Sequence, residues 1–123
     1  MAIDTALLLR DGSANLETTE GTPTAIDFRG IDYKPMFYFL SVPAVSSGDT
    51  LDVKIQGSNN NSDFYDVLVF PQVNGTTGAG VFHLEGTVNY RYRRYVATVG
   101  GNGSANFGAV KIGVVPGGRY TDL

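Results

Sequence analysis

The sequence predicts an all-β protein, a single-domain antiparallel β-sandwich of about eight strands with a jelly-roll architecture. First, 16 glycines among 123 residues, with only 17% charged residues, favour many turns over long helices. Second, no window keeps the i, i+3, i+4, i+7 apolar spacing of an amphipathic helix for three turns. Third, short runs that alternate apolar and polar residues recur between segments rich in glycine, asparagine and serine. Short strands separated by such turns are typical of sandwiches and jelly rolls.

The expected strands occupy, in chain order, residues 5–10, 24–29, 36–42, 50–57, 64–70, 80–85, 92–99 and 107–115. The clearest is TLDVKIQG, in which Leu51, Val53 and Ile55 alternate with polar residues, so that one face packs in a core and the other meets water. The run VKIGVV at 110–115 repeats this pattern, with its first, third and fifth residues toward the core. Turn-rich segments at 57–63, 74–80 and 100–106 separate these strands, because glycine and asparagine tolerate positive φ.

The length of the chain suits one domain, here residues 1–123, and no linker divides it. Residues 1–12 can form an N-terminal arm and residues 116–123 a C-terminal tail. Without cysteine there is no disulfide framework and no thiolate metal site. The first apolar run, 6–9, is too short for a signal peptide and follows no basic residues, and no window has the roughly 18 apolar residues of a membrane span. We therefore expect a soluble protein that does not associate with membranes.

Charge is unevenly distributed along the chain. Residues 1–66 hold ten acidic and four basic residues, net −6, whereas residues 67–123 hold two acidic and five basic residues, net +3. The overall charge of −3 argues against a dedicated nucleic-acid binder. The asymmetry suits a protein that meets its own copies or an acidic protein surface.

Candidate catalytic and metal-binding residues are few. His83 is the only histidine, and Glu85 shares its strand face in GVFHLEG. Two ligands from one strand are too few for a zinc site, and a serine nucleophile would need the same histidine. We interpret His83 as a structural strand residue, and we expect no catalytic residues, no metal and no cofactor.

The stretch NYRYRRYVATVGG at 89–101 is the strongest candidate for a binding surface. Interleaved arginines and tyrosines suit either nucleic acid or a protein interface, since both side chains combine apolar area with directed hydrogen bonds. Because side chains alternate along a strand, Arg93 and Tyr95 point to one side of it and Tyr92 and Arg94 to the other. We favour a protein interface over an ordinary sandwich edge or a nucleic-acid contact. Replacing all three arginines with alanine is then expected to weaken partner binding and leave the domain folded.

Three segments together resemble a known family, the jelly-roll capsid cement (decoration) proteins of tailed bacteriophages, of the type first described on a Bordetella phage. They are DTALLLRDG, LDVKIQGSNNNSDFYDV and RRYVATVGGNGSANFGAVKIGVVPG, which appear in the order of the family and span nearly the whole chain. Residues 7–10 match the characteristic N-terminal segment, and residues 93–99 match the strand before the last hairpin. Residues 22–36 depart from the family pattern.

The resemblance implies a structural protein that binds the outside of an HK97-type phage head, bridges neighbouring major capsid proteins and stabilises the shell. It implies residence on the capsid exterior of the virion, and in the host cytoplasm during assembly, with self-association as a homo-dimer or homo-trimer. No direct contact with nucleic acid is expected. The residues expected at protein interfaces are Leu7, Leu8, Leu9, Arg10, Tyr90, Arg91, Tyr92, Arg93, Arg94 and Tyr95.

A second interpretation stays open, because jelly rolls host many functions. The fold also serves carbohydrate-binding and receptor-binding modules, which need exposed aromatic rings beside polar loops. Tyr33, Phe64 and Tyr65 are the candidates for such a platform.

Overall fold

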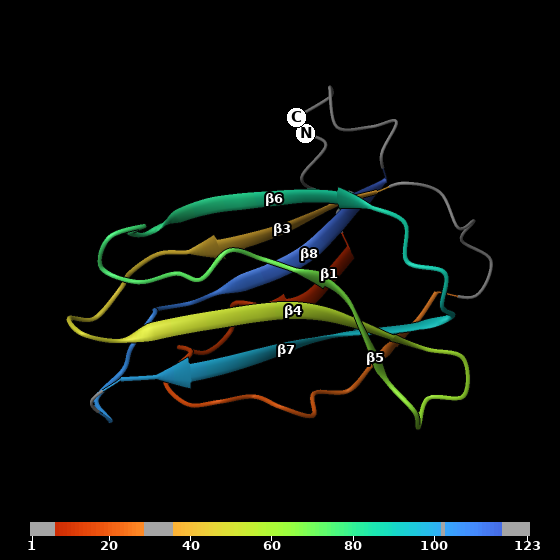
Figure 1. Cartoon of the computed structure of the whole chain (residues 1–123), viewed down its shortest axis with the longest axis horizontal. Coiled ribbons are helices and arrows are strands. Elements are labelled where there is room, and N and C mark those ends of the chain that lie inside the picture. The colour runs from red at the N-terminus through yellow and green to blue at the C-terminus, as the bar shows by residue number, and fades with distance from the viewer. Residues whose placement is uncertain (1–6, 29–35, 102, 117–123) are drawn as a thin grey trace.

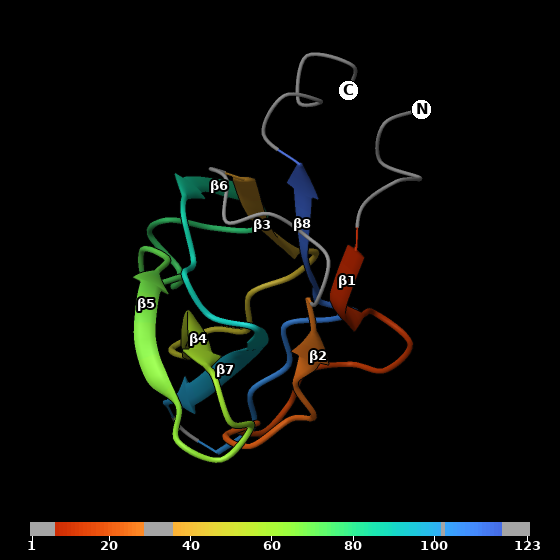
Figure 2. The ribbon, with the colours of Figure 1, turned by 90° about the vertical axis from the view of Figure 1, so that its right-hand side faces the viewer.

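The fold is a sandwich of two antiparallel sheets. The computed structural model describes residues 7–28, 36–101 and 103–116, and over these residues it contains strands and no helix. The strands are β1 (Leu7–Asp11), β2 (Ile26–Asp27), β3 (Met36–Val42), β4 (Thr50–Ser58), β5 (Tyr65–Val69), β6 (Gly80–Gly86), β7 (Tyr92–Gly100) and β8 (Lys111–Pro116). One sheet has the order β1-β8-β3-β6 and the other β2-β7-β4-β5, stacked face to face (Figures 1 and 2). This order of eight strands in two sheets is that of a jelly roll and confirms the predicted fold class.

Each expected strand has a counterpart, and the differences in length have local causes. The strand expected at 107–115 begins only at Lys111, because Phe107 donates its backbone N–H to Leu16 and Gly108 turns the chain with a φ of 77°. The strand expected at 24–29 is reduced to the two residues of β2, although Phe28 adds one backbone bond to Arg91. Residues 7–11 of the proposed arm form β1, and residues 1–6 and 117–123 lie outside the described residues.

The core lies between the sheets and follows the predicted alternation. The inward-facing residues of β4 and β8 are those that the period of two predicts, and the residues of β3 alternate in the same way. They include Tyr38, Leu40, Leu51, Val53, Ile55, Ile112 and Val114. Phe39 and Val115 are also buried, at 7% and 1% exposure, but they lie outside this core cluster because they point away from it. One sheet therefore carries buried apolar side chains on both of its faces.

The pairing of β1 with β8 joins the beginning and the end of the described chain. Leu7 lies opposite Val114 and Asp11 opposite Lys111, so β1 starts at the end of the sandwich where β8 finishes (Figure 2). The register shifts between Leu8 and Arg10, which marks a bulge at Leu9.

A segment between β1 and β2 ties the two sheets together. Glu20 and Ala97 of β7 exchange two backbone hydrogen bonds, of 2.8 and 3.0 Å. Leu16, fully buried, pairs in the same way with the segment before β8, through Phe107 and Gly108. This segment therefore closes the side of the sandwich formed by β1 and β2.

Candidate functional site

The three arginines of the basic stretch take three different positions. Arg91 precedes β7, Arg93 points between the sheets, and Arg94 points outward, as the period of two predicts. Each guanidinium is engaged within this chain. The stretch therefore does not form one continuous basic surface.

Arg91 lies just before β7, beside the edge strand β2 with which β7 pairs. Its Nε and Nη2 donate to both carboxylate oxygens of Asp27 at 2.9 Å, and its guanidinium lies 5.0 Å from the ring centre of Tyr92. Both members of the ion pair are about one-third exposed, so solvent screens it and its contribution to stability is small. This bidentate pair therefore adds only a side-chain contact to the backbone pairing of the short strand β2 with β7.

Arg93 is buried, with 1% exposure, in the end of the core near β3. Its Nη1 donates to the Tyr38 hydroxyl at 2.8 Å, its Nε donates to the Tyr90 carbonyl at 3.1 Å, and the guanidinium lies 4.2 Å from the ring centre of Phe28. Burial raises the pKa of Tyr38, and the neighbouring guanidinium opposes that rise. Arg93 therefore supports the fold of its own chain. This position corrects the expectation that all three arginines can be replaced with the domain intact.

Removing the Tyr38 hydroxyl isolates this cation further. Among the described residues the Nη2 of Arg93 already lacks a hydrogen-bond partner, and Tyr38→Phe leaves Nη1 with only the weak thioether of Met36. We expect Tyr38→Phe to lower the free energy of unfolding by about 1–3 kcal/mol, the usual penalty for an unsatisfied buried donor. Urea denaturation measures this, with Tyr92→Phe as the control. Equal stabilities of the two variants would contradict the assignment.

Arg94 belongs to a polar network on the outward face of the sheet β2-β7-β4-β5. Its guanidinium lies 3.8 Å from the ring centre of Phe64, and its Nε donates to Gln56 at 2.8 Å. Gln56 and Lys54 in turn donate to the two carboxylate oxygens of Asp66. We call these four polar residues, Lys54, Gln56, Asp66 and Arg94, the polar outer face.

The expected tyrosines differ in exposure. Tyr90 stacks on Tyr65, with ring centres 6.0 Å apart and planes 26° apart, and it covers Gly57 so closely that a side chain there would collide with it. Tyr92 is half-buried and Tyr95 is 7% exposed. Among the tyrosines that the structure describes, only Tyr65, at 57% exposure, presents a large aromatic surface to solvent.

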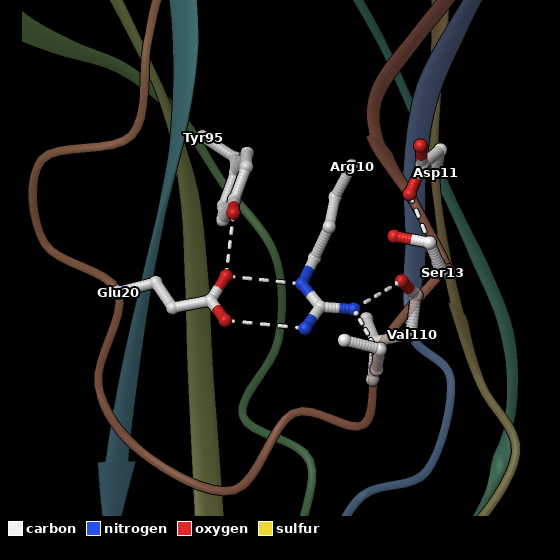
Figure 3. Close-up of polar contacts among 7 residues, drawn as sticks. Arg10, Asp11, Ser13, Glu20, Tyr95 and Val110 are labelled. Atoms are coloured by element: carbon white, nitrogen blue, oxygen red, sulfur yellow. Dashed lines mark hydrogen bonds and ion pairs between the residues drawn. The ribbon is translucent and has the colours of Figure 1, made fainter.

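Two of the expected interface segments meet through a residue that sequence reasoning missed. Arg10 of β1 and Tyr95 of β7 both bind the carboxylate of Glu20 (Figure 3). The guanidinium donates to Glu20 at 3.0 and 3.1 Å and to the carbonyls of Ala14 and Val110 at 3.0 and 2.8 Å, while the phenol donates to Glu20. Because β1 and β7 belong to opposite sheets, this Arg10–Glu20–Tyr95 network links the sheets through side chains.

In the network, the partly buried charges of Arg10 and Glu20 form hydrogen bonds with each other, and this shifts the pKa values of both. The hydrogen bond from Arg10 lowers the pKa of Glu20 and raises the pKa of Arg10 itself. Burial, followed by the carboxylate, raises the pKa of Tyr95 to about 12. A hollow of about 570 Å³ lies beside the network, but the charged groups of Arg10 and Glu20 that line it are already bound to each other. We therefore interpret the network as a structural link.

Acid should weaken the fold through these carboxylates. Glu20 and Asp66 have lowered pKa values, chiefly because of hydrogen bonds from Arg10 and from Gln56. A pKa that is lower in the folded state stabilises the protein above the unfolded value of about 4, and this stabilisation is lost as the pH falls through the folded value. We expect a constant thermal midpoint from neutral pH to about pH 5 and a fall below about pH 4. Calorimetry across this range tests the sign, and a midpoint that rises on acidification contradicts it.

The leucines of β1 divide between surface and core. Leu7 and Leu8 are each 36% exposed, whereas Leu9 packs against the core cluster. Leu8 lies opposite Gly113, whose neighbour on the other side is Phe39, and the Phe39 ring covers the bare backbone of Gly113. These contacts place Leu8 and Phe39 on the same outward side of the sheet.

That outward side carries more apolar side chains than the polar outer face of the other sheet does. The residues that alternate with core positions on β3, β6 and β8 point there, and the exposure of Val81 reaches 56%. We call this surface the apolar outer face; its apolar residues are Leu8, Phe37, Phe39, Val81 and Val115.

His83 and Glu85 also lie on this side, both exposed on β6. Within residues 7–28, 36–101 and 103–116, no three histidine, aspartate or glutamate side chains come together as metal ligands.

None of the described segments is a helix with the length and apolarity that membrane crossing requires. Comparison with models of protein families, with curated proteins and with solved structures finds no match to this chain.

Proposed function

We propose that this protein is a capsid cement protein, which binds the outer surface of an HK97-type phage head, bridges major capsid proteins and stabilises the shell. The observation that carries this proposal is the difference between the two outward sides of the sandwich. One carries the apolar outer face and the other the hydrogen-bonded polar outer face. A protein that lies on a shell needs one side for the shell and one for water.

The apolar outer face has the composition of an interface centre. Exposed clusters of apolar side chains rimmed by polar ones mark protein–protein contacts more often than solvent surfaces. Here Val81 and Leu8 are exposed to either side of the Phe39 ring, with Lys111 and Glu85 at the rim. The jelly roll itself agrees with the fold that the resemblance to cement proteins implies.

A protein partner fits the basic stretch better than nucleic acid does. Arg91 is paired with Asp27, Arg93 is buried, and Arg94 lies over Phe64, so these cations are engaged within the chain. Phosphate binding depends on basic groups that release counterions from the nucleic acid. We therefore place the protein on the capsid exterior, and in the host cytoplasm during assembly, without direct nucleic-acid contact.

Weak contacts suffice for this role, because a shell repeats each site many times. A decoration protein that touches several capsid subunits gains effective concentration for each further contact. The proposal therefore needs no deep pocket and no catalytic group.

Co-sedimentation with empty HK97-type heads that lack their own decoration protein tests the proposal. Leu8→Asp places a charge on the apolar outer face, whereas Val69→Asp places one on the opposite side, where Val69 is 64% exposed. We expect Leu8→Asp to weaken head binding about tenfold or more, the effect of burying one unpaired charge, and Val69→Asp to leave it unchanged. Failure of the wild-type protein to sediment with heads, or equal loss in both variants, would reject the proposal.

One observation favours a second candidate function, binding of a carbohydrate or a receptor. The exposed ring of Tyr65, stacked on Tyr90, lies after the polar turn 59–63, in which the Asn60 side chain accepts hydrogen bonds from two backbone N–H groups. Phe64 offers less, since Arg94 covers its ring, and Tyr33 lies outside the described residues. A glycan array with wild-type protein and Tyr65→Ala distinguishes the two functions, because head binding should not depend on Tyr65.

A further inference from the structure

The four edge strands of the sandwich differ in how they prevent pairing with another chain. β1 has five residues, a bulge at Leu9 and an inward-pointing charge at Arg10, and β2 has only two residues. β5 has five residues, a register shift against β4, and a surface ion pair between Lys54 and Asp66. Short length, bulges and charges are the usual means by which natural edges avoid intermolecular pairing.

β6 is the least protected of the four edges, since its one acidic side chain, Glu85, lies next to its last residue. It spans seven residues, pairs with β3 in unbroken register from Gly80 to Gly86, and contains no proline, lysine or arginine. It is the outermost strand of its sheet, and the described residues form no ladder on its other side (Figure 1). Its backbone therefore offers a row of hydrogen-bonding groups to a further strand.

The side chains of β6 are also incompletely covered. Phe82 and Leu84 point toward the core but are only half-buried, unlike the inward residues of β3, which are buried. On the other side Val81 is 56% exposed. A strand added beside β6 would cover apolar surface on both sides of the sheet.

The inward-facing apolar residues of β6 match each other when the strand pairs with a second copy of itself. In an antiparallel pair centred on His83, Phe82 of one copy lies opposite Leu84 of the other, and Val81 lies opposite Glu85. All seven residues are then paired, from the glycine at one end to the glycine at the other. An arrangement in which one strand meets the same strand of a second copy is a closed two-fold interface.

We propose that this protein forms a two-fold homodimer through β6, in which the two β1-β8-β3-β6 sheets join into one continuous eight-stranded sheet. The partner is a second copy because the strand fits its own antiparallel image. The pairing uses the longest and most regular edge among the described strands, and each copy then has no free β6 edge for a third. The dimer does not depend on head binding, although it places two apolar outer faces in one sheet.

Sedimentation equilibrium of the wild-type protein gives the first test. We expect a mass twice the 13.1 kDa of the chain. His83→Lys places two ammonium groups opposite each other at the two-fold axis and should weaken dimerisation about fivefold or more, whereas Val69→Lys, on the edge strand of the other sheet, should not. A monomer or a trimer at every concentration, or equal weakening by the two variants, would overturn the proposal.

Cysteine scanning tests the register, because the natural chain has no cysteine. Directly opposite residues of an antiparallel pair have Cβ atoms about 4.5–5.5 Å apart, close to the range that a disulfide spans. Mild oxidation should cross-link His83→Cys with itself, leave Val81→Cys uncross-linked, and cross-link a mixture of Val81→Cys and Glu85→Cys. Cross-linking of Val81→Cys alone as readily as His83→Cys contradicts the register. Circular dichroism verifies that each variant keeps the β-sandwich.

Discussion

Glu20→Ala should lower the free energy of unfolding by about 2–3 kcal/mol, one of the two largest effects we expect from a single substitution. The substitution leaves the Nε and Nη2 of Arg10 without an acceptor, and Arg10 is only 8% exposed. It also removes the acceptor of the Tyr95 phenol. Loss of one partner from a fully buried pair costs about 3–5 kcal/mol, and the 31% exposure of the Glu20 side chain places this case lower.

Thermal denaturation measures the effect, with a fall of roughly 10 °C expected for a chain of this size. Glu17→Ala is the matched control, because Glu17 is exposed in the same segment and accepts only one long hydrogen bond, from Asn106. Glu20→Gln should lie between the two, since the amide keeps a hydrogen bond but not the charge. If Glu20→Ala and Glu17→Ala melt together, the Arg10–Glu20–Tyr95 network does not stabilise the sandwich.

Gly113→Val should destabilise the protein by a similar amount, about 3 kcal/mol, through overpacking. A Cβ at Gly113 meets two ring atoms of Phe39 at 2.8 Å and the backbone carbonyl of Leu7 at 3.0 Å. To make room for the new side chain, the Phe39 ring must move away from residue 113. The Leu7 carbonyl belongs to the neighbouring strand β1, so it can move only if the backbone of β1 moves.

Urea denaturation measures this loss, and a second substitution identifies its cause. Adding Phe39→Ala to Gly113→Val removes the ring and should recover part of the stability that Gly113→Val loses relative to Phe39→Ala alone. Gly21→Val is the control, since nothing lies within 4 Å of its added Cβ. Additive effects of the two substitutions would show that the ring does not cause the strain.

The sequence predicted the strands well because alternation reports directly which face is buried. Leu51, Val53 and Ile55 behave as expected, since β4 has one face in the core and one in solvent. Val115 does not, because it points away from the core cluster and is still only 1% exposed; a period of two reports the direction of a side chain and not how far other side chains cover it. The bounds at 107–110 failed for another reason, since the buried Phe107 is held by a bridge to Leu16, far away in the chain.

The candidate site was less predictable than the fold. The arginine- and tyrosine-rich stretch identified Arg93 and Tyr95, and the resemblance to cement proteins identified Arg10, but interface arginines and buried structural arginines have the same sequence signature. Glu20 gave no signal, since it lies in a turn-rich segment without a strand pattern, and only the sheet stacking brings it between Arg10 and Tyr95. A pairing over 75 positions, as between Glu20 and Tyr95, is a property of topology that local patterns do not encode.

The seam between β1 and β8 determines how the molecule bears mechanical load. Because Leu7 lies opposite Val114, tension applied between the two ends of the described chain opens that seam like a zipper, breaking its ladder bonds one at a time. Shear along the strands, applied to opposite ends of β1 and β8, instead loads these ladder bonds in parallel. The protein should thus yield at low force when stretched from its ends, and resist far better when neighbouring strands are sheared past each other.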